Sequence, residues 1–239
     1  PRNSQWEICG GSLMEIHPSP TFRQQMLQKI EQREFKERTG THCSDLLYCL
    51  NKQALRRLSP LPTTDHELLL FSLGWASQRW LTGRIADEPE IEQDGLVVTL
   101  DAKTKDGQPW ELKATFQSNT RPIEENAHWI RQIMAQCYVA GTTAAYLSRL
   151  EIMGNWKSVF GNKEEKNLPE NQKPTLSAYK LVFSLDELCR NWEWLLDRKG
   201  RFEEILRTRT LLPKAVAVPS GQEWECKFCP YRGGGCCLE

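Results

Sequence analysis

Several features that would assign this chain to a special class of proteins are missing from its sequence. No apolar run approaches the roughly 18 residues that a membrane-spanning helix needs, and no segment repeats along the chain. There is also no excess of either charge, because 31 lysines and arginines balance 31 acidic residues. We therefore expect no membrane partner and no repeat array, and any contact with nucleic acid must depend on local basic patches or bound cations.

The composition is typical of a globular protein, with 39% hydrophobic and 26% charged residues. The 239 residues are enough for one large domain or two small ones. The patterns described below predict a single compact unit in three parts: an N-terminal helical segment (1–62), a core (63–208) and a cysteine-rich tail (209–239).

A β-hairpin is predicted near the middle of the chain. Residues 95–99 are apolar and β-branched, which favours a strand, and residues 110–116 suit its returning partner. Between them, Asp106-Gly107 is typical of a two-residue type I′ turn, in which both central residues need a positive φ.

Three polar side chains are expected to meet on this hairpin. The predicted turn places Glu111 opposite Ala102, and a one-residue slip places it opposite Asp101, so the two carboxylates are neighbours in either register. Lys113 projects from the same face as Glu111, because it lies two residues further along the strand. Cross-strand pairs of opposite charge are also an ordinary feature of hairpin surfaces.

The residue types in this group suit metal-assisted hydrolysis of a phosphodiester. Carboxylates are hard ligands that favour Mg²⁺ or Mn²⁺, and we expect Asp101 and Glu111 to bind such an ion with the Leu112 carbonyl as a further oxygen. The ion would activate a water and stabilise charge on the phosphate. Lys113 could orient that water, deprotonate it or stabilise the transition state, and we expect it to orient the water. Asp94, which also precedes an apolar strand, is the alternative to Asp101.

The remaining periodicity predicts an α/β fold. The expected helices cover about residues 21–38, 45–58, 65–82, 123–140 and 184–208, and the expected strands cover about 142–152 and 179–183. In the helix after the hairpin, the expected buried stripe consists of Ile123, Ala127, Ile130, Met134 and Cys137. This order of elements favours a mixed central β-sheet flanked by helices.

The distribution of the nine cysteines is informative. Four of them lie within twelve residues at the C-terminus, which indicates metal or cluster binding in a reducing compartment, here the cytoplasm: Cys226, Cys229, Cys236 and Cys237. The first three suit either zinc or an iron–sulfur cluster, and we favour Cys49 over Cys237 as the fourth ligand. Cys43 remains open. Three further cysteines on apolar stretches are expected to be buried thiols: Cys9, Cys137 and Cys189.

Two cysteine-containing stretches resemble a known arrangement. Cys49 lies in Ser44-Asp-Leu-Leu-Tyr-Cys-Leu-Asn-Lys, and the tail contains Cys226-x-x-Cys229-Pro-Tyr followed by Cys236. Together they resemble the iron–sulfur staple of the RecB-like PD-(D/E)xK nucleases, which include the CRISPR-associated exonucleases. The resemblance implies a restriction-endonuclease-like core and a structural 4Fe–4S cluster that is held by these four cysteines.

The nuclease motifs of that family have counterparts here in the same order. Leu100-Asp101 is similar to the PD element, and Glu111-Leu-Lys113 is similar to the (D/E)xK element. Gln132 resembles the polar residue of the following helix, which implies that it positions the lysine or the phosphate. Gln78 occupies a position where the family usually has Glu or His. Because an amide is a weaker metal ligand than a carboxylate, the resemblance leaves the role of Gln78 in the site open.

These patterns predict a metal-dependent DNA nuclease that hydrolyses phosphodiester bonds, with Mg²⁺ or Mn²⁺ and a 4Fe–4S cluster as cofactors. Exonuclease activity is expected, and single-stranded DNA is the expected substrate because aromatic and basic side chains bind bases and phosphates. The resemblance implies a role in CRISPR adaptation beside the integrase, or in recombination and repair beside helicase subunits. The alternative, favoured by Gln78, is an inactive nuclease fold that serves as a DNA-binding or scaffold module.

Overall fold

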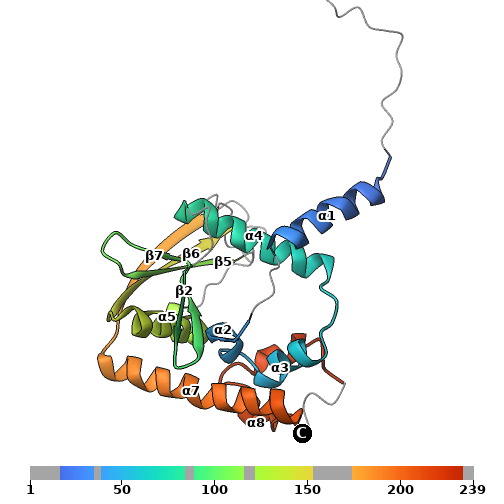
Figure 1. Ribbon diagram of the computed structural model, residues 1–239. Helices are drawn as coiled ribbons and strands as arrows, with labels where there is room; N and C mark the ends of the chain where they lie inside the picture. Colours follow the sequence, from blue (N-terminus) through green and yellow to red (C-terminus); the bar gives the residue numbers. More distant parts are fainter. Residues whose placement is uncertain (1–16, 35–38, 84–88, 116–121, 153–173, 234–239) are drawn as a thin grey trace, which may run out of the picture. The chain divides into compact units, whose positions relative to one another are not determined.

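The computed structural model describes residues 17–34, 39–83, 89–115, 122–152 and 174–233 (Figure 1). The chain divides into two compact units, residues 1–36 and 37–239. In the first unit, α1 (Pro20–Glu34) is a largely polar helix in which Leu27 is buried. No helix within the described ranges is long and apolar enough to cross a membrane.

The second unit contains two mixed β-sheets. One has the strand order β1-β3-β2, in which β1 is parallel and β2 antiparallel to the central β3. The other has the order β4-β5-β6-β7, in which β5 and β6 are parallel and the outer pairs are antiparallel. The strands are β1 (Thr41–His42), β2 (Glu90–Gln93), β3 (Leu96–Thr99), β4 (Ala102–Lys103), β5 (Pro109–Thr115), β6 (Ala144–Glu151) and β7 (Thr175–Val182).

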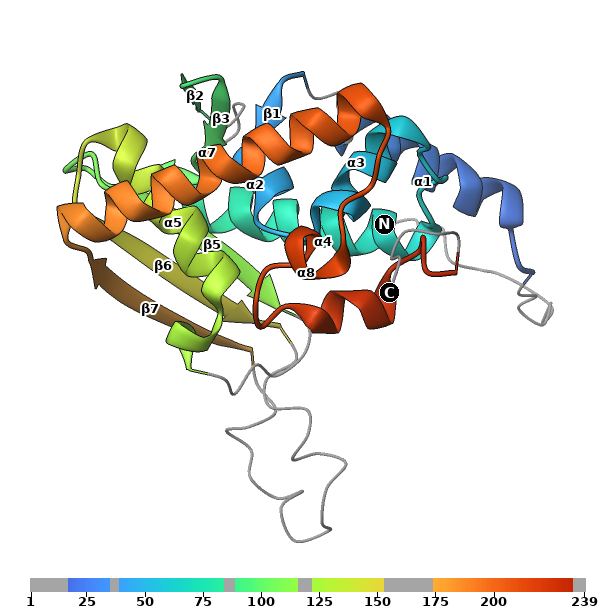
Figure 2. The same ribbon diagram turned by 90° about the horizontal axis from the view of Figure 1, so that it is seen from below.

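Helices flank these sheets. α5 lies between the β4–β7 sheet and the long helix α7, whereas α4 lies against the other face of that sheet (Figures 1 and 2). The helices are α2 (Cys43–Leu46), α3 (Leu50–Leu58), α4 (Asp65–Thr82), α5 (Ala127–Ala140), α7 (Leu185–Thr208) and α8 (Lys214–Ala217), with 3₁₀ turns η1 (Ile123–Glu125) and η4 (Glu223–Phe228). The predicted mixed α/β class is confirmed, although the strands form two sheets instead of one.

Capping residues explain where the main helices begin. Thr64 precedes α4 and Ser184 precedes α7, and each hydroxyl accepts a hydrogen bond from the backbone N–H of a glutamate three residues later. Each glutamate carboxylate accepts a hydrogen bond in return from the backbone N–H of the capping residue. α5 ends at Gly141, which has the positive φ that terminates many helices. The helix expected at 45–58 was predicted without a break, but α2 and α3 are separate.

The central hairpin is shorter than predicted, and its turn is of a different type. The Gly107 N–H donates to the Thr104 carbonyl, and Gly107 has a φ of 78°, whereas Asp106 does not have a positive φ. This is a three-residue loop in which one glycine alone takes the left-handed conformation. As a consequence Ala102 pairs with Trp110, which is the second of the two expected registers, shifted by one residue from the first.

The type I′ turn lies instead at Asp94-Gly95, which joins β2 to β3. Both residues have a positive φ, 53° and 68°, and Gln93 pairs with Leu96 across the turn. β3 therefore pairs with β1 and β2 and does not pair with β5. The prediction that residues 95–99 form one long hairpin with residues 110–116 was wrong.

The two larger clusters of the hydrophobic core lie on either side of α5. One cluster joins α2, α3, β3 and α7, and the other lies between α5 and the β4–β7 sheet. The buried residues of α5 are Trp129, Ile133, Ala135, Gln136 and Cys137. The predicted stripe was wrong at Ala127, which is exposed, and at Ile130 and Met134, which are half-buried. Because α5 is covered on two sides, its buried arc is wider than a single stripe.

Burial of the cysteines follows the predictions only in part. Cys137 is buried as predicted, but Cys189 on α7 is exposed, so that prediction was wrong. Cys43 is buried. Cys9 lies outside the described residues.

Candidate metal-binding and catalytic site

Asp101 occupies the short gap between β3 and β4, directly after the fully buried Leu100. β4 pairs only with the first two residues of β5, so the Leu112 N–H further along β5 is left for another acceptor. The Asp101 Oδ2 atom accepts a hydrogen bond from this N–H over 2.8 Å. The hairpin therefore fixes the Asp101 carboxylate beside the middle of β5.

Glu111 on β5 is almost fully enclosed, with 1% of its surface exposed. Its Oε1 atom accepts a hydrogen bond from Lys113 Nζ over 2.5 Å, and its Oε2 atom accepts one from Gln136 Nε2 over 2.6 Å. Gln136 belongs to α5 and also donates to the Thr99 carbonyl over 3.0 Å. Both oxygens of this buried carboxylate are thus paired, as burial of a charge requires.

Lys113 connects β5 to α5. Its Nζ atom donates to Gln132 Oε1 over 2.8 Å in addition to its bond with Glu111. Burial alone would lower the pKa of this ammonium group, but the negative charges of Glu111 and Asp101 outweigh burial and raise the pKa above its ordinary value. In the metal-free protein Lys113 is therefore a cation at neutral pH and cannot act as a general base.

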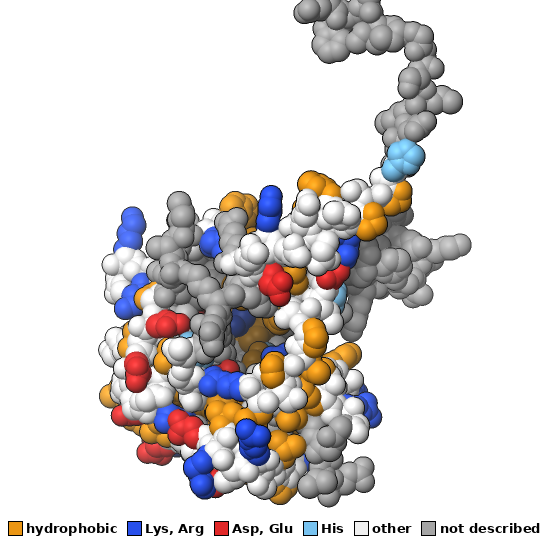
Figure 3. Space-filling model, turned by 45° about the vertical axis from the view of Figure 1, so that its right-hand side comes forward, with side chains coloured by type: hydrophobic (Ala, Val, Ile, Leu, Met, Phe, Trp, Pro, Cys, Tyr) orange, Lys and Arg blue, Asp and Glu red, His pale blue; other side chains and the backbone are white. Residues whose placement is uncertain are grey.

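Three further titratable side chains surround this group. Burial raises the pKa of the Cys43 thiol to about 12, and the charge of Glu111 adds to the shift. Burial also raises the pKa of Tyr48 and lowers that of His128 to about 4, and the positive charge of Lys113 acts downward on both. His128 lies one helical turn before Gln132, the partner of Lys113, and the Tyr48 ring centroid is 5.4 Å from that of His128. The face drawn in Figure 3 is hollowed, and hydrophobic and Lys or Arg side chains line the hollow.

The composition of the group suits one divalent cation. Asp101 and Glu111 carry two negative charges against the single positive charge of Lys113, so a net negative charge remains. The Leu112 N–H points toward Asp101, and because the N–H and carbonyl of one strand residue point the same way, the Leu112 carbonyl also lies on the Asp101 side of β5. Within the described ranges no three His, Cys, Asp or Glu side chains gather as a metal site. A carbonyl and waters would have to complete the coordination.

The structure brings together the residues that the sequence nominated: Asp101, Glu111, Leu112, Lys113 and Gln132. Asp94 is not part of this group. It lies in the β2–β3 turn, where its Oδ2 atom accepts a hydrogen bond from the Trp192 indole over 2.9 Å. Roughly 20 Å of extended chain separates it from Asp101.

Sequence reasoning missed the role of Gln136. It is fully buried and holds Glu111 from α5, four residues after Gln132 on the same helix. Its Oε1 atom is buried and accepts no hydrogen bond from the residues that the structure describes. A second glutamine one helical turn from the first, on a face that also carries Ile133, was the available signal.

The predicted cysteine ligands fall partly within the described chain. Cys49 is buried, and Cys226 packs against the same small apolar cluster, so two segments far apart in sequence meet there. Cys229 is half-buried. Cys236 and Cys237 lie outside the described residues, and the four-cysteine ligand set stays a prediction.

Polar contacts fasten the tail beside Cys49. Glu225 of η4 is 2% exposed, and its Oε1 atom accepts a hydrogen bond from the Cys49 N–H over 3.2 Å. Its other oxygen forms an ion pair with Lys52 of α3. The buried carboxylate therefore has two partners, both near the N-terminal end of α3.

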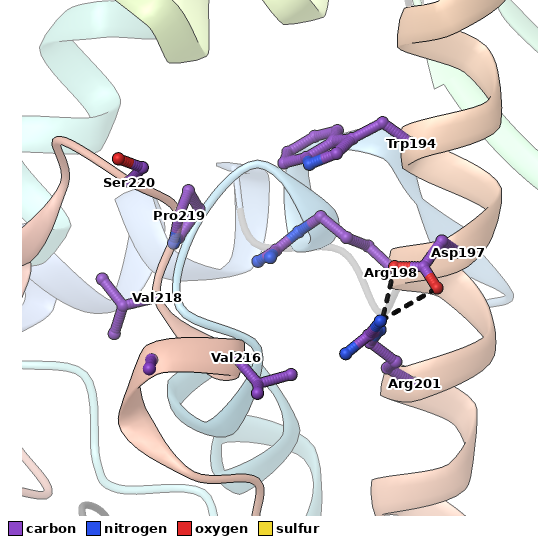
Figure 4. A pocket seen from close by; sticks show the side chains of 9 residues that line it. Trp194, Asp197, Arg198, Arg201, Val216, Val218, Pro219 and Ser220 are labelled. Carbon is purple, nitrogen blue, oxygen red and sulfur yellow. Dashed lines mark hydrogen bonds and ion pairs between the residues drawn. The ribbon is translucent and has the colours of Figure 1, made fainter.

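A separate pocket of about 280 Å³ lies between α7 and the segment that contains α8. Figure 4 shows Arg198 reaching from α7 across this pocket, while Arg201 on the same helix pairs with Asp197. Arg198 is 5% exposed and donates to three backbone carbonyls: Leu46 and Tyr48, each at 2.6 Å, and Ala217, at 3.2 Å. Burial lowers its pKa to about 10, which leaves it charged at neutral pH.

Comparisons with known proteins complete the description. No protein-family model matches the sequence. No curated protein matches it either. Among solved structures, it is similar to SSO0001, with 16% identity, a TM-score of 0.49, and coverage of 87% of this chain and 93% of that chain. It is also similar to a phage-related exonuclease from Haemophilus somnus 129PT, with 8% identity, a TM-score of 0.45, and coverage of 72% of this chain and 97% of that chain. At these values neither similarity assigns a function.

Proposed function

We propose that this protein is a metal-dependent nuclease that hydrolyses phosphodiester bonds in DNA. One observation carries the proposal: Lys113 donates a hydrogen bond to Glu111, which is only 1% exposed, and the Leu112 N–H between them in sequence holds the Asp101 carboxylate beside the same strand. An ordinary ion pair on a hairpin surface would be open to solvent. Buried ionisable groups with a strongly shifted pKa, as Lys113 has, occur at functional sites more often than elsewhere.

Each residue of the group has a distinct role in this proposal. Asp101, Glu111 and the Leu112 carbonyl would hold Mg²⁺ or Mn²⁺, which when bound supplies an activated water and an electrophile for the phosphate. Lys113, which the two carboxylates keep protonated, binds a phosphate oxygen and stabilises the negative charge that develops on it. Gln132 keeps the ammonium group in position through its Oε1 atom.

The substrate class in this proposal is single-stranded DNA, degraded as by an exonuclease. Aromatic and basic side chains close to Lys113 support it, because they suit unpaired bases and phosphates. The cellular setting we propose is CRISPR adaptation with the integrase, or recombination and repair with helicase subunits. The order of the sequence motifs alone supports that setting.

We further propose that Cys49, Cys226, Cys229 and Cys236 hold a structural 4Fe–4S cluster. The meeting of Cys49 and Cys226 in one apolar cluster supports this assignment. The three described cysteines do not gather as a ligand group, so Cys229 would have to approach the other two when the cluster binds. Anaerobic purification tests it: the protein should be brown, with about four iron and four sulfide ions per chain. A colourless protein that contains zinc would contradict the assignment.

The nuclease proposal is tested by incubating end-labelled single- and double-stranded DNA with the protein and Mg²⁺ or Mn²⁺. Asp101→Asn should lower the cleavage rate by about 100-fold or more, because it removes a charge that the reaction needs. Asp106→Asn is the matched control, since Asp106 is an exposed acid in the same hairpin. Equal activity of the two variants would refute the assigned site.

A second candidate is an inactive nuclease fold that binds DNA. It is favoured by the lack, within the described ranges, of a metal site with three or more His, Cys, Asp or Glu ligands. The same experiment separates the two functions. DNA binding without cleavage in either metal ion would support the second candidate.

A further inference from the structure

Three aromatic side chains from distant segments form one surface, which we call the aromatic wall: Tyr48, His128 and Trp224. Tyr48 lies between α2 and α3, His128 in the first turn of α5, and Trp224 in η4. The ring centroids of Tyr48 and His128 are 5.4 Å apart, and those of His128 and Trp224 are 6.2 Å apart. The rings are tilted at 49° and 53° and do not stack on one another. The contacts among the three rings therefore do not occupy the ring faces on which a base could stack.

The aromatic wall is accessible from outside. Trp224 is 41% exposed, and Tyr48 and His128 are half-buried. A side chain that served only to fill the core would be enclosed like Leu50, which is fully buried beside this region. The exposure of Trp224 is therefore a feature that core packing does not explain.

Positively charged side chains lie near the aromatic wall and near the proposed site. His128 lies one helical turn before Gln132 on α5, and Gln132 accepts a hydrogen bond from Lys113. Lys52 Nζ lies 5.6 Å from the centroid of the Tyr48 ring. Two lysines therefore lie near the aromatic wall or the site beside it, Lys52 in an ion pair with Glu225 and Lys113 in an ion pair with Glu111.

We propose that the aromatic wall stacks the bases of a single DNA strand and so delivers a phosphate to Asp101, Glu111 and Lys113. This inference rests on the proposed nuclease function and assigns its substrate contacts. A duplex cannot use the aromatic wall, because its bases already stack on one another. The chain also has no net charge, so attraction to phosphates must come from local cations such as Lys113. Base stacking adds affinity that does not depend on the base sequence.

The test measures binding of a fluorescent single-stranded oligonucleotide in Ca²⁺, which permits binding while suppressing cleavage. Trp224→Leu should weaken binding about tenfold, since one lost base–aromatic stack has roughly that effect. Trp224→Phe should restore most of the affinity, because it keeps an aromatic face. Phe228→Leu is the matched control, because Phe228 is 79% exposed in the same η4 segment. Duplex binding should be the same in all variants.

A second measurement on the unmodified protein does not depend on any variant folding correctly. The oligonucleotide carries 2-aminopurine at successive positions, and stacking against the aromatic wall should quench its fluorescence at one or two of them. Unquenched fluorescence at every position would overturn the inference, as would equal binding by Trp224→Leu and Phe228→Leu.

The outcomes separate this inference from the proposed function. If the protein cleaves DNA in a metal-dependent way but Trp224→Leu does not weaken oligonucleotide binding, the stacking role of the aromatic wall is refuted and the nuclease function is not. Binding that depends on Trp224, without cleavage in Mg²⁺ or Mn²⁺, would refute the nuclease function and leave the aromatic wall standing.

Discussion

Arg198 joins three segments of the second unit, so its replacement should destabilise the whole fold. Its guanidinium group donates hydrogen bonds to the carbonyls of Leu46, Tyr48 and Ala217. It also lies over the Trp194 ring, 4.9 Å from the centroid. Arg198→Met keeps the length of the side chain and removes every donor, so three carbonyls lose their partner at once.

The magnitude follows from these contacts. Leaving one buried acceptor without its hydrogen bond costs about 1–3 kcal/mol. Some water will reach carbonyls at the edge of the pocket, so we expect a total loss of about 3–5 kcal/mol in the free energy of unfolding. With a urea m value of about 2 kcal/mol/M, the midpoint of unfolding should fall by about 1.5–2.5 M.

Urea unfolding followed by circular dichroism measures this loss, with Arg201→Met as the control. Arg201 lies one turn away on α7 and makes an exposed ion pair with Asp197, which contributes at most about 1 kcal/mol. Arg198→Lys should also be destabilised, because a single ammonium group cannot reproduce the planar fork of arginine. Equal midpoints for Arg198→Met and Arg201→Met would refute this reasoning.

Three further predictions concern single side chains. Gln136→Leu should lower the free energy of unfolding, measured in urea, by about 2–3 kcal/mol, because one oxygen of the buried Glu111 loses its donor. A change below about 0.5 kcal/mol would contradict the hydrogen bond between Gln136 and Glu111. Burial holds the pKa of His128 at about 4, so the metal-free protein should lose stability as the pH falls from about 6.5, where the unfolded histidine takes up its proton, to about 4. Urea unfolding at pH 7 and at about pH 4.5 measures this loss in the free energy of unfolding. In His128→Phe the loss should be smaller by about 2–3 kcal/mol than in the unmodified protein. An unchanged pH dependence would contradict this prediction. Asp94→Ala should lower the free energy of unfolding by about 1–2 kcal/mol and leave DNA cleavage unchanged. Asp101→Asn, in contrast, should lower the cleavage rate by about 100-fold or more. The reverse pattern would make Asp94 the metal-binding acid.

The local part of the candidate site was predictable from sequence because it depends on strand geometry. Glu111 and Lys113 share a face through their spacing of two residues, and their contact follows from that alone. Asp101 was predicted as a cross-strand neighbour of Glu111. It lies there, but its carboxylate bonds to the Leu112 N–H, a contact that depends on where β4 stops pairing.

The two Asp-Gly pairs show why the turns could not be predicted from dipeptides. Asp94-Gly95 forms a two-residue turn with two positive φ values, whereas in Asp106-Gly107 the glycine alone is left-handed. The difference lies in pairing partners that are distant in sequence. β3 pairs with β1, in which Thr41 lies opposite Leu96. This pairing places β3 in a different sheet from β5.

Gln136 illustrates what sequence periodicity leaves out. Its hydrogen bond to Glu111 depends on how α5 packs against β5, and helix packing angles are set by contacts along the whole helix. The same packing shifted the buried arc of α5 away from the expected stripe at Ala127. Gln132 was assigned a role through its motif, whereas the more deeply buried Gln136 of the same stretch was assigned none.

The most direct test of the central claim is the rate of single-stranded DNA cleavage in Mn²⁺ by the unmodified protein, Lys113→Ala and Lys103→Ala. Lys103 is an exposed lysine of the same hairpin, which makes it the matched control. The unmodified protein and Lys103→Ala should cleave at the same rate, EDTA should abolish cleavage, and Lys113→Ala should be slower by about 100-fold or more. Cleavage by Lys113→Ala at the unmodified rate would contradict the account.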